Sequence, residues 1–190
     1  MKKVAGMLAD YFYREDKFQG ISYDAFQYAL EFALEMGTGI FASAMIAVIF
    51  DMEGETAAFL LIFWVLRSYV GGLHLEAFWQ CFLFSTAVIA GAMAAVRYFT
   101  VEPLWPHFMY LAGALAFLQT EPENDKNRRV DTDEDLYFKG KLLQCLILIT
   151  IAYIYCTFTN NVRYTFVIAL AVDVVYVLMI LGKWKNGKNK

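Results

Sequence analysis

The sequence predicts an all-α integral membrane protein with six transmembrane helices, preceded by an N-terminal amphipathic helix at the membrane interface. Three observations lead to this fold class. Hydrophobic residues make up 59% of the 190 residues, which is too apolar for an ordinary soluble domain. The apolar residues fall into stretches close to the ~20 residues that span a bilayer. Almost all basic residues fall on one predicted side of the membrane, as is typical of cytoplasmic segments.

The first 20 residues predict a helix in the headgroup region rather than a signal peptide, because they contain no continuous apolar core and no small-residue cleavage pattern. A helix packed on the protein itself explains the same pattern equally well. Apolar residues share one helical face, and charged residues lie elsewhere: Val4, Leu8, Tyr11, Phe12 and Phe18 against Lys3, Asp10, Arg14 and Lys17.

Residues 1–190 form a single polytopic domain in this interpretation. The breaks between the spans are a short acidic turn, a segment with two prolines, a long charged loop and an Asn-Asn pair. The six spans are predicted near residues 25–50, 56–72, 77–98, 103–120, 141–159 and 163–182.

The distribution of Lys and Arg predicts that both termini are cytoplasmic. With that orientation, 14 of the 16 basic residues lie on the cytoplasmic side. Arg97 and Arg163 remain outside.

The stretch "RSYVGGLHLEAFWQC" (67–81) is a cytoplasmic-side turn between the second and third spans. It holds an arginine, a Gly-Gly pair, a histidine and a cysteine among apolar neighbours. Because the apolar run before Arg67 is short, either Arg67 snorkels to the interface or the turn dips into the membrane. Backbone at that depth must be buried in protein or line a wet cavity.

His74 and Cys81 have the chemistry of a nucleophilic dyad, in which an imidazole favours the thiolate. On one continuous helix they would lie about 10 Å apart along the axis, too far for a hydrogen bond. A dyad therefore requires a break within residues 70–76, which Gly71 and Gly72 permit.

The residues alone leave other roles open. A histidine at a membrane turn is more often structural than catalytic, and a cysteine one turn into a span is usually a small apolar residue. A metal site built from His74, Glu76 and Cys81 lacks a fourth ligand at any usual spacing. No metal and no cofactor is predicted.

The pattern R-x3-G-G-x-H-x6-C, in a six-span chain of this length, resembles the accessory gene regulator B family of membrane-embedded cysteine endopeptidases in quorum sensing. The charged loop "TEPENDKNRRV" between spans four and five resembles the family's Pro-containing loop. The chain departs from the family at Leu75 and Glu76, where small or neutral residues are common. That departure concerns substrate preference rather than chemistry.

The resemblance implies that Cys81 is the nucleophile and His74 its general base, supported by Arg67, Gly71 and Gly72. The partner would be a short amphipathic precursor peptide, cut at the cytoplasmic face of a bacterial cell membrane. The C-terminal fragment leaves, and a Cys or Ser inside the peptide then attacks the thioester to form a thiolactone or lactone. A backbone N–H at the turn or the Gln80 side chain is a candidate oxyanion donor.

Several other polar residues lie within or between the spans. Intramembrane acids usually face a cavity or a basic partner, so Asp173 is a candidate for either, whereas Glu31 and Glu35 are also compatible with the interface. Cys145 and Cys156 suggest packing, and His107 a structural role. The loop cations Lys126, Arg128 and Arg129 suggest a solvated connector, or a contact with an acidic peptide tail.

The net charge of −3 argues against a nucleic-acid partner. The rival to a peptidase is a non-enzymatic multi-pass protein, either a small transporter or a peptide-binding subunit. The lipid bilayer is a partner in both interpretations. Six spans of this size enclose little space for a peptide, which makes a homodimer with a shared cavity compatible with the sequence.

Overall fold

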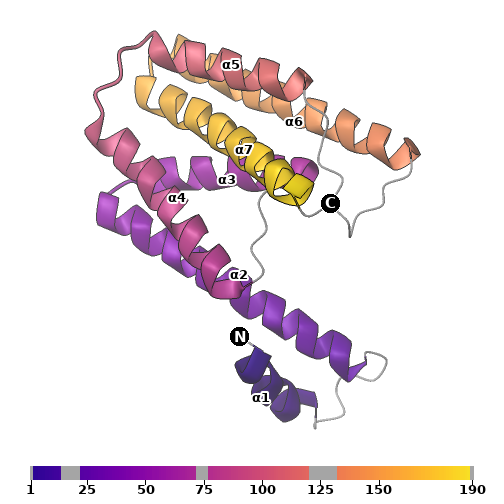
Figure 1. Ribbon diagram of the computed structural model, residues 1–190. Coiled ribbons are helices and arrows are strands. Elements are labelled where there is room, and N and C mark those ends of the chain that lie inside the picture. Colours follow the sequence, from indigo (N-terminus) through magenta and orange to yellow (C-terminus); the bar gives the residue numbers. More distant parts are fainter. Residues whose placement is uncertain (1, 14–21, 72–76, 120–131, 189–190) are drawn as a thin grey trace.

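The computed structural model describes residues 2–13, 22–71, 77–119 and 132–188, and this part of the chain contains α-helices and no strand. The all-α class is therefore confirmed. The helices are α1 (Lys2–Tyr13), α2 (Tyr23–Phe50), α3 (Glu53–Val70), α4 (Phe78–Tyr98), α5 (Trp105–Gln119), α6 (Thr132–Phe158) and α7 (Val162–Lys188) (Figure 1).

Four helices of the described chain are long and apolar enough to cross a membrane: α2, α4, the Tyr137–Phe158 part of α6 and the Val162–Lys185 part of α7. Of the other three helices, α3 and α5 lie close to predicted spans but are less suited to cross a membrane. α5 has 15 residues, about 22 Å of helix against a hydrocarbon core of ~30 Å. α3 carries Glu53, Glu55 and Arg67 among its 18 residues. Six spans and the cytoplasmic placement of both termini stay predictions.

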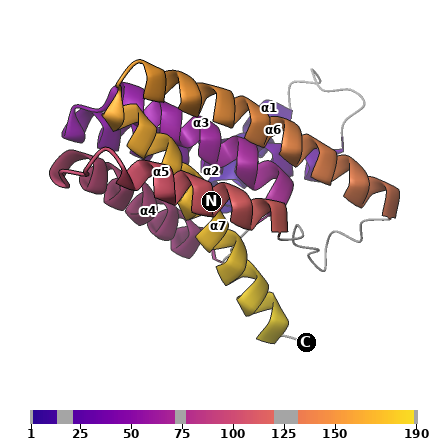
Figure 2. The same cartoon turned by 90° about the horizontal axis from the view of Figure 1, so that it is seen from above.

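From α2 to α7, successive helices alternate in direction, with α7 at the centre (Figures 1 and 2). α7 packs against α3, α4, α5 and α6. Its small and β-branched residues allow this close approach on several sides, and Val167, Ala169, Ala171 and Val172 are fully buried. The outer helices instead expose large apolar side chains, which suits lipid rather than water.

Two tight corners join helices at the end of the bundle where α2 and α6 finish. Each uses a short polar residue with a left-handed backbone, Asp51 (φ 54°) and Asn160 (φ 54°). The backbone amide of the next residue donates a hydrogen bond to the preceding helix in each corner. Met52 N–H donates to Ala47 O at 2.9 Å, and Asn161 N–H donates to Cys156 O at 2.9 Å. These bonds satisfy carbonyls that a helix end leaves unpaired.

An ion pair connects these corners. Arg163 at the start of α7 donates through Nε to Glu55 Oε1 of α3 at 2.7 Å. Glu55 is only 9% exposed, so its charge requires such a partner. The pair fixes the start of α3 against the start of α7.

α1 packs along the first half of α2 (Figure 1). Ala5 and Ala9 are fully buried there, and Tyr23 Oη donates to Asp10 Oδ1 at 2.6 Å. Met7 and Tyr11 are exposed on α1. The helix therefore packs on the protein and still presents apolar residues outward, while its position at a membrane interface stays a prediction. Residues 14–20 of the predicted N-terminal helix lie outside the described residues.

Candidate active site

Arg67 lies on the last turn of α3, facing the beginning of α4. Its guanidinium lies over the Phe63 ring, 5.6 Å from the centroid. Its positive charge also interacts electrostatically with Cys81. Two residues 14 positions apart in the sequence thus interact between the end of α3 and the start of α4.

The turn begins at Gly71, where α3 ends. Gly71 has φ 74° and ψ −149°, a backbone conformation that is strained for any residue with a Cβ. Helix α4 does not begin until Phe78. The predicted break within residues 70–76 is therefore confirmed at its first positions.

Cys81 lies at the end of the first turn of α4. Its amide donates to Ala77 O at 3.2 Å, and the residue is half-buried. Phe78 stacks on Phe82 beside it, with ring centroids 5.8 Å apart. The thiol is thus held on the first turn of a regular helix that also carries two stacked aromatic rings.

Two sources of positive potential lie near this position. The first turn of a helix carries the positive end of its dipole, and the Arg67 guanidinium interacts electrostatically with Cys81. Positive potential of this kind is suited to the oxyanion that forms when a nucleophile attacks a carbonyl.

Several predicted site residues lie outside the described residues: Gly72, His74, Glu76, Lys126, Arg128 and Arg129. The proximity of His74 to Cys81 consequently stays a prediction. Gln80 is described and exposed. Among the described residues, His, Cys, Asp and Glu side chains form no group of metal ligands.

The three acids within the predicted spans occupy different surroundings. Glu31 and Glu35 are half-buried on α2. Asp173 of α7 lies against α5 at Gly113, where any side chain would collide with its carboxylate. The glycine thus permits the close contact of α5 and α7 that holds Asp173 in place. The functional roles of all three acids stay predictions.

A hollow between α2 and α4 was not anticipated from the sequence. It has a volume of about 370 Å³, and we call it the α2–α4 groove. The one feature of the sequence that could have indicated this hollow is the set of small residues on one side of α2. Its lining consists of Ala33, Leu34, Gly37, Thr38, Phe41 and Ala42 of α2, together with Phe82 of α4.

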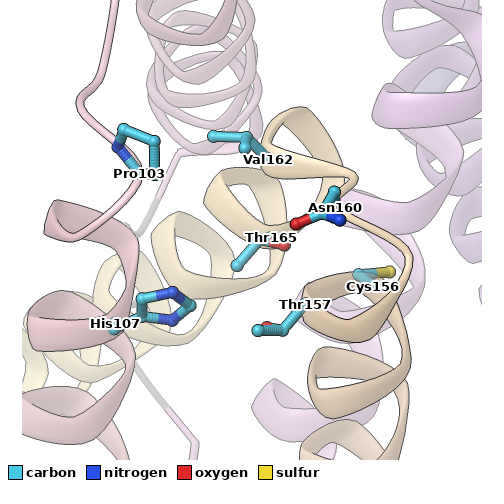
Figure 3. A pocket seen from close by; sticks show the side chains of 7 residues that line it. All are labelled: Pro103, His107, Cys156, Thr157, Asn160, Val162 and Thr165. Atoms are coloured by element: carbon cyan, nitrogen blue, oxygen red, sulfur yellow. The ribbon is translucent and has the colours of Figure 1, made fainter.

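A second, smaller pocket of about 80 Å³ lies among α5, α6 and α7, near the corner at Asn160 (Figure 3). His107 bonds through Nδ1 to Tyr153 Oη at 2.5 Å, which ties α5 to α6. Cys156 lies across the pocket from His107 (Figure 3). The wider lining comprises Pro103, Thr157, Asn160, Val162 and Thr165. The bond of His107 agrees with the structural role predicted for it.

Comparison with known protein families identifies a family to which the chain is similar. The family model described as "Accessory gene regulator B" matches residues 3–180. This match covers nearly the whole chain, from α1 into α7. No curated protein and no solved structure matches the chain.

Proposed function

Because the chain belongs to the Accessory gene regulator B family, membrane proteins of quorum-sensing peptide processing, we propose that it is a membrane-embedded cysteine endopeptidase. Cys81 is the nucleophile and His74 the general base. The substrate is a short amphipathic precursor peptide that meets the site at the cytoplasmic side of a bacterial cell membrane. The same reaction leads to a cyclic autoinducing peptide.

In the first half-reaction, His74 takes the proton of the Cys81 thiol. The thiolate attacks the scissile carbonyl carbon, and the carbonyl oxygen becomes an oxyanion. When this intermediate collapses, the C–N bond breaks and His74 returns its proton to the leaving amine. The C-terminal fragment departs, and the rest of the peptide stays on Cys81 as a thioester.

In the second half-reaction, a Cys thiol or Ser hydroxyl within the bound peptide attacks the thioester carbonyl. The bond to Cys81 Sγ breaks, the nucleophile's proton passes to the thiolate through His74, and a thiolactone or lactone is released. Exclusion of water matters here because water would hydrolyse the thioester before the ring closes. The half-buried position of Cys81 supports this step.

One observation carries the proposal furthest. The chain breaks at Gly71 and resumes as a helix whose first turn holds Cys81, with Arg67 near enough to interact with it. A cysteine used only for packing needs neither a helix start nor a cation beside it. A nucleophile that must bear negative charge benefits from both.

The proposal is tested by co-expression with candidate precursor peptides, followed by mass spectrometry of the products. Cys81→Ala and His74→Ala should each abolish cleavage while protein level and membrane insertion are retained. Cys145→Ala and Cys156→Ala are matched controls, because both cysteines are half-buried on α6, and they should cleave normally. Cleavage that survives both active-site substitutions would favour the rival interpretation of a transporter or peptide-binding protein.

A further inference from the structure

Asp173 is the only Asp, Glu, Lys, Arg or His between residues 164 and 182 of α7. It lies eleven residues after Val162, the first residue of the helix, which is about 16 Å along the helix axis. The centre of a hydrocarbon core of ~30 Å lies at about the same depth, and α7 is long and apolar enough to cross such a core. The length of α7 therefore places this carboxyl near the middle of the bilayer.

The helices that pack against α7 offer Asp173 no cationic partner. Within the described chain, Asp173 forms no ion pair and no hydrogen bond. Arg67, on the last turn of α3, lies over Phe63 and interacts with Cys81 of α4, whereas Asp173 faces α5. The central parts of α3, α4, α5 and α6, which all contact α7, contain no Asp, Glu, Lys, Arg or His: residues 56–66, 78–96, 108–119 and 142–158.

The carboxyl group lies directly against the backbone of α5. A Cβ at Gly113 would collide with Asp173 Oδ1 and would come within 3.0 Å of Val172 Cγ1. Gly113 is itself buried, so α5 closes over one side of the carboxyl, while Asp173 as a whole is half-buried. Because the accessible part lies at bilayer depth, a small apolar molecule dissolved in the bilayer can reach it.

The titratable groups nearest along α5 and α7 are two tyrosines that already have other contacts. Tyr110 Oη of α5 shares a hydrogen bond with Thr150 Oγ1 of α6 at 2.7 Å. Tyr176 of α7 packs edge-on against Phe117 of α5, with ring centroids 5.4 Å apart. A phenol is neutral at neutral pH, so neither tyrosine compensates the charge of an ionised Asp173. The other titratable side chains in the central parts of the surrounding helices, none of them cationic, are Cys81 of α4 and Cys145, Tyr153, Tyr155 and Cys156 of α6.

An ionised carboxylate at this depth is costly when no cation compensates its charge, and a bound proton removes that charge. We propose that Asp173 is an intramembrane proton-binding site, whose carboxyl is protonated at neutral pH while α5 lies against it at Gly113. The ligand of this site is the proton alone. The site is separate from the proposed peptidase chemistry and does not depend on it.

Dicyclohexylcarbodiimide tests for the proton directly, because this apolar reagent enters the bilayer and reacts with protonated carboxyls. The carboxyl proton passes to one nitrogen of the reagent, and the carboxylate oxygen bonds to its central carbon. The adduct then rearranges to a stable N-acylurea with no atom lost. The full chain would be treated in membrane vesicles at neutral pH and digested for mass spectrometry. The water-soluble dimethylaminopropyl analogue, applied in parallel, reports carboxyls that face water.

Asp173 should be modified by the apolar reagent and not by the water-soluble one. Glu102, exposed in the connection between α4 and α5, should show the reverse preference. Asp173→Asn should lose the adduct at this position, whereas Glu102→Gln should keep the adduct on Asp173. No adduct on Asp173 in wild type, or equal modification of Asp173 by both reagents, would overturn the proton-binding site.

Stability provides a second readout that needs no reagent. The folded protein holds the proton, whereas the unfolded chain releases it above about pH 4, so wild type should lose stability as the pH rises. Between about pH 5 and about pH 8, the melting temperature of the detergent-solubilised wild type should fall by roughly 3 °C or more relative to Asp173→Asn, which has no proton to lose. Melting temperatures of the two proteins that change in parallel over this range would contradict the proposal.

Discussion

At the scale of single residues, the proposed function gives Arg67 the role of stabilising negative charge at the site. Its guanidinium lies over the Phe63 ring and interacts electrostatically with Cys81. A cation fixed in this way stabilises charge that develops during reaction better than a mobile one. Phe63 is itself 7% exposed, so the supporting ring has little freedom to move.

Arg67→Gln should lower kcat for peptide cleavage by on the order of tenfold or more, because it removes this charge. Arg67→Lys should retain part of the activity. The pH profile of Cys81 alkylation by iodoacetamide should also shift upward in Arg67→Gln, a change that a purely structural role would not cause. Arg97→Gln, at the far end of α4, is the control. An unchanged pH profile of Cys81 alkylation in Arg67→Gln would show that Arg67 does not act on the Cys81 thiol.

Gly71 is the second residue on which the proposed site depends. Gly71→Ala should strain the backbone at φ 74° and ψ −149°, at a cost of about 1–3 kcal/mol. The chain should relieve this strain by shifting the start of the turn, so we expect lower cleavage together with a lower melting temperature. Gly140→Ala is matched, because a Cβ there meets nothing within 4 Å and the residue lies inside α6. Wild-type cleavage by Gly71→Ala would show that the turn geometry is dispensable.

At the scale of elements, the helices follow directly from the sequence pattern. Each long apolar run ends at residues that cannot continue it, such as the acidic turn at Asp51 or the Asn pair at Asn160. The ends of α2 to α5 therefore lie within three residues of the predicted spans, whereas α6 begins nine residues before its predicted span and α7 ends six residues after its own. The α2–α4 groove could not be predicted in this way. It depends on where α4 crosses α2, and the spacing of residues within either helix does not contain that information.

The contact between α5 and α7 makes a prediction at this scale. Gly113→Leu should force α5 away from Asp173 and Val172, with overpacking that costs about 1–3 kcal/mol. A lower melting temperature of the detergent-solubilised protein measures this. Gly91→Leu on α4 should have little effect, because a Cβ at Gly91 meets nothing within 4 Å. Equal stability of the two variants would mean that α5 and α7 are not held this closely.

At the scale of the whole molecule, the helices form a bundle around α7, whereas α2, α4 and α6 are largely exposed. The bundle directions alternate (Figure 1), as a chain that crosses a membrane repeatedly requires. Composition was sufficient to predict the membrane setting. It could not determine whether α3 and α5 cross fully, because α3 carries charges and α5 has 15 residues.

Reporter fusions test the predicted topology. Alkaline phosphatase fused after Thr100, between α4 and α5, should be active because this connection is predicted to lie outside. A green fluorescent protein fused after Lys190 should fluoresce, since the C-terminus is predicted to be cytoplasmic. Protein levels on immunoblots control for expression. Inactive phosphatase after Thr100, at normal protein level, would contradict the predicted orientation.

The central claim is that Cys81 carries the peptide as a thioester, and this intermediate can be sought directly. The purified protein would be mixed with a cleavable precursor peptide, quenched in acid within seconds and digested for mass spectrometry. The account predicts that the fragment containing Cys81 gains the mass of the peptide's N-terminal part, and that neutral hydroxylamine removes it. A peptide that is cut at normal rate by Cys81→Ala, or an adduct on another residue, would contradict it.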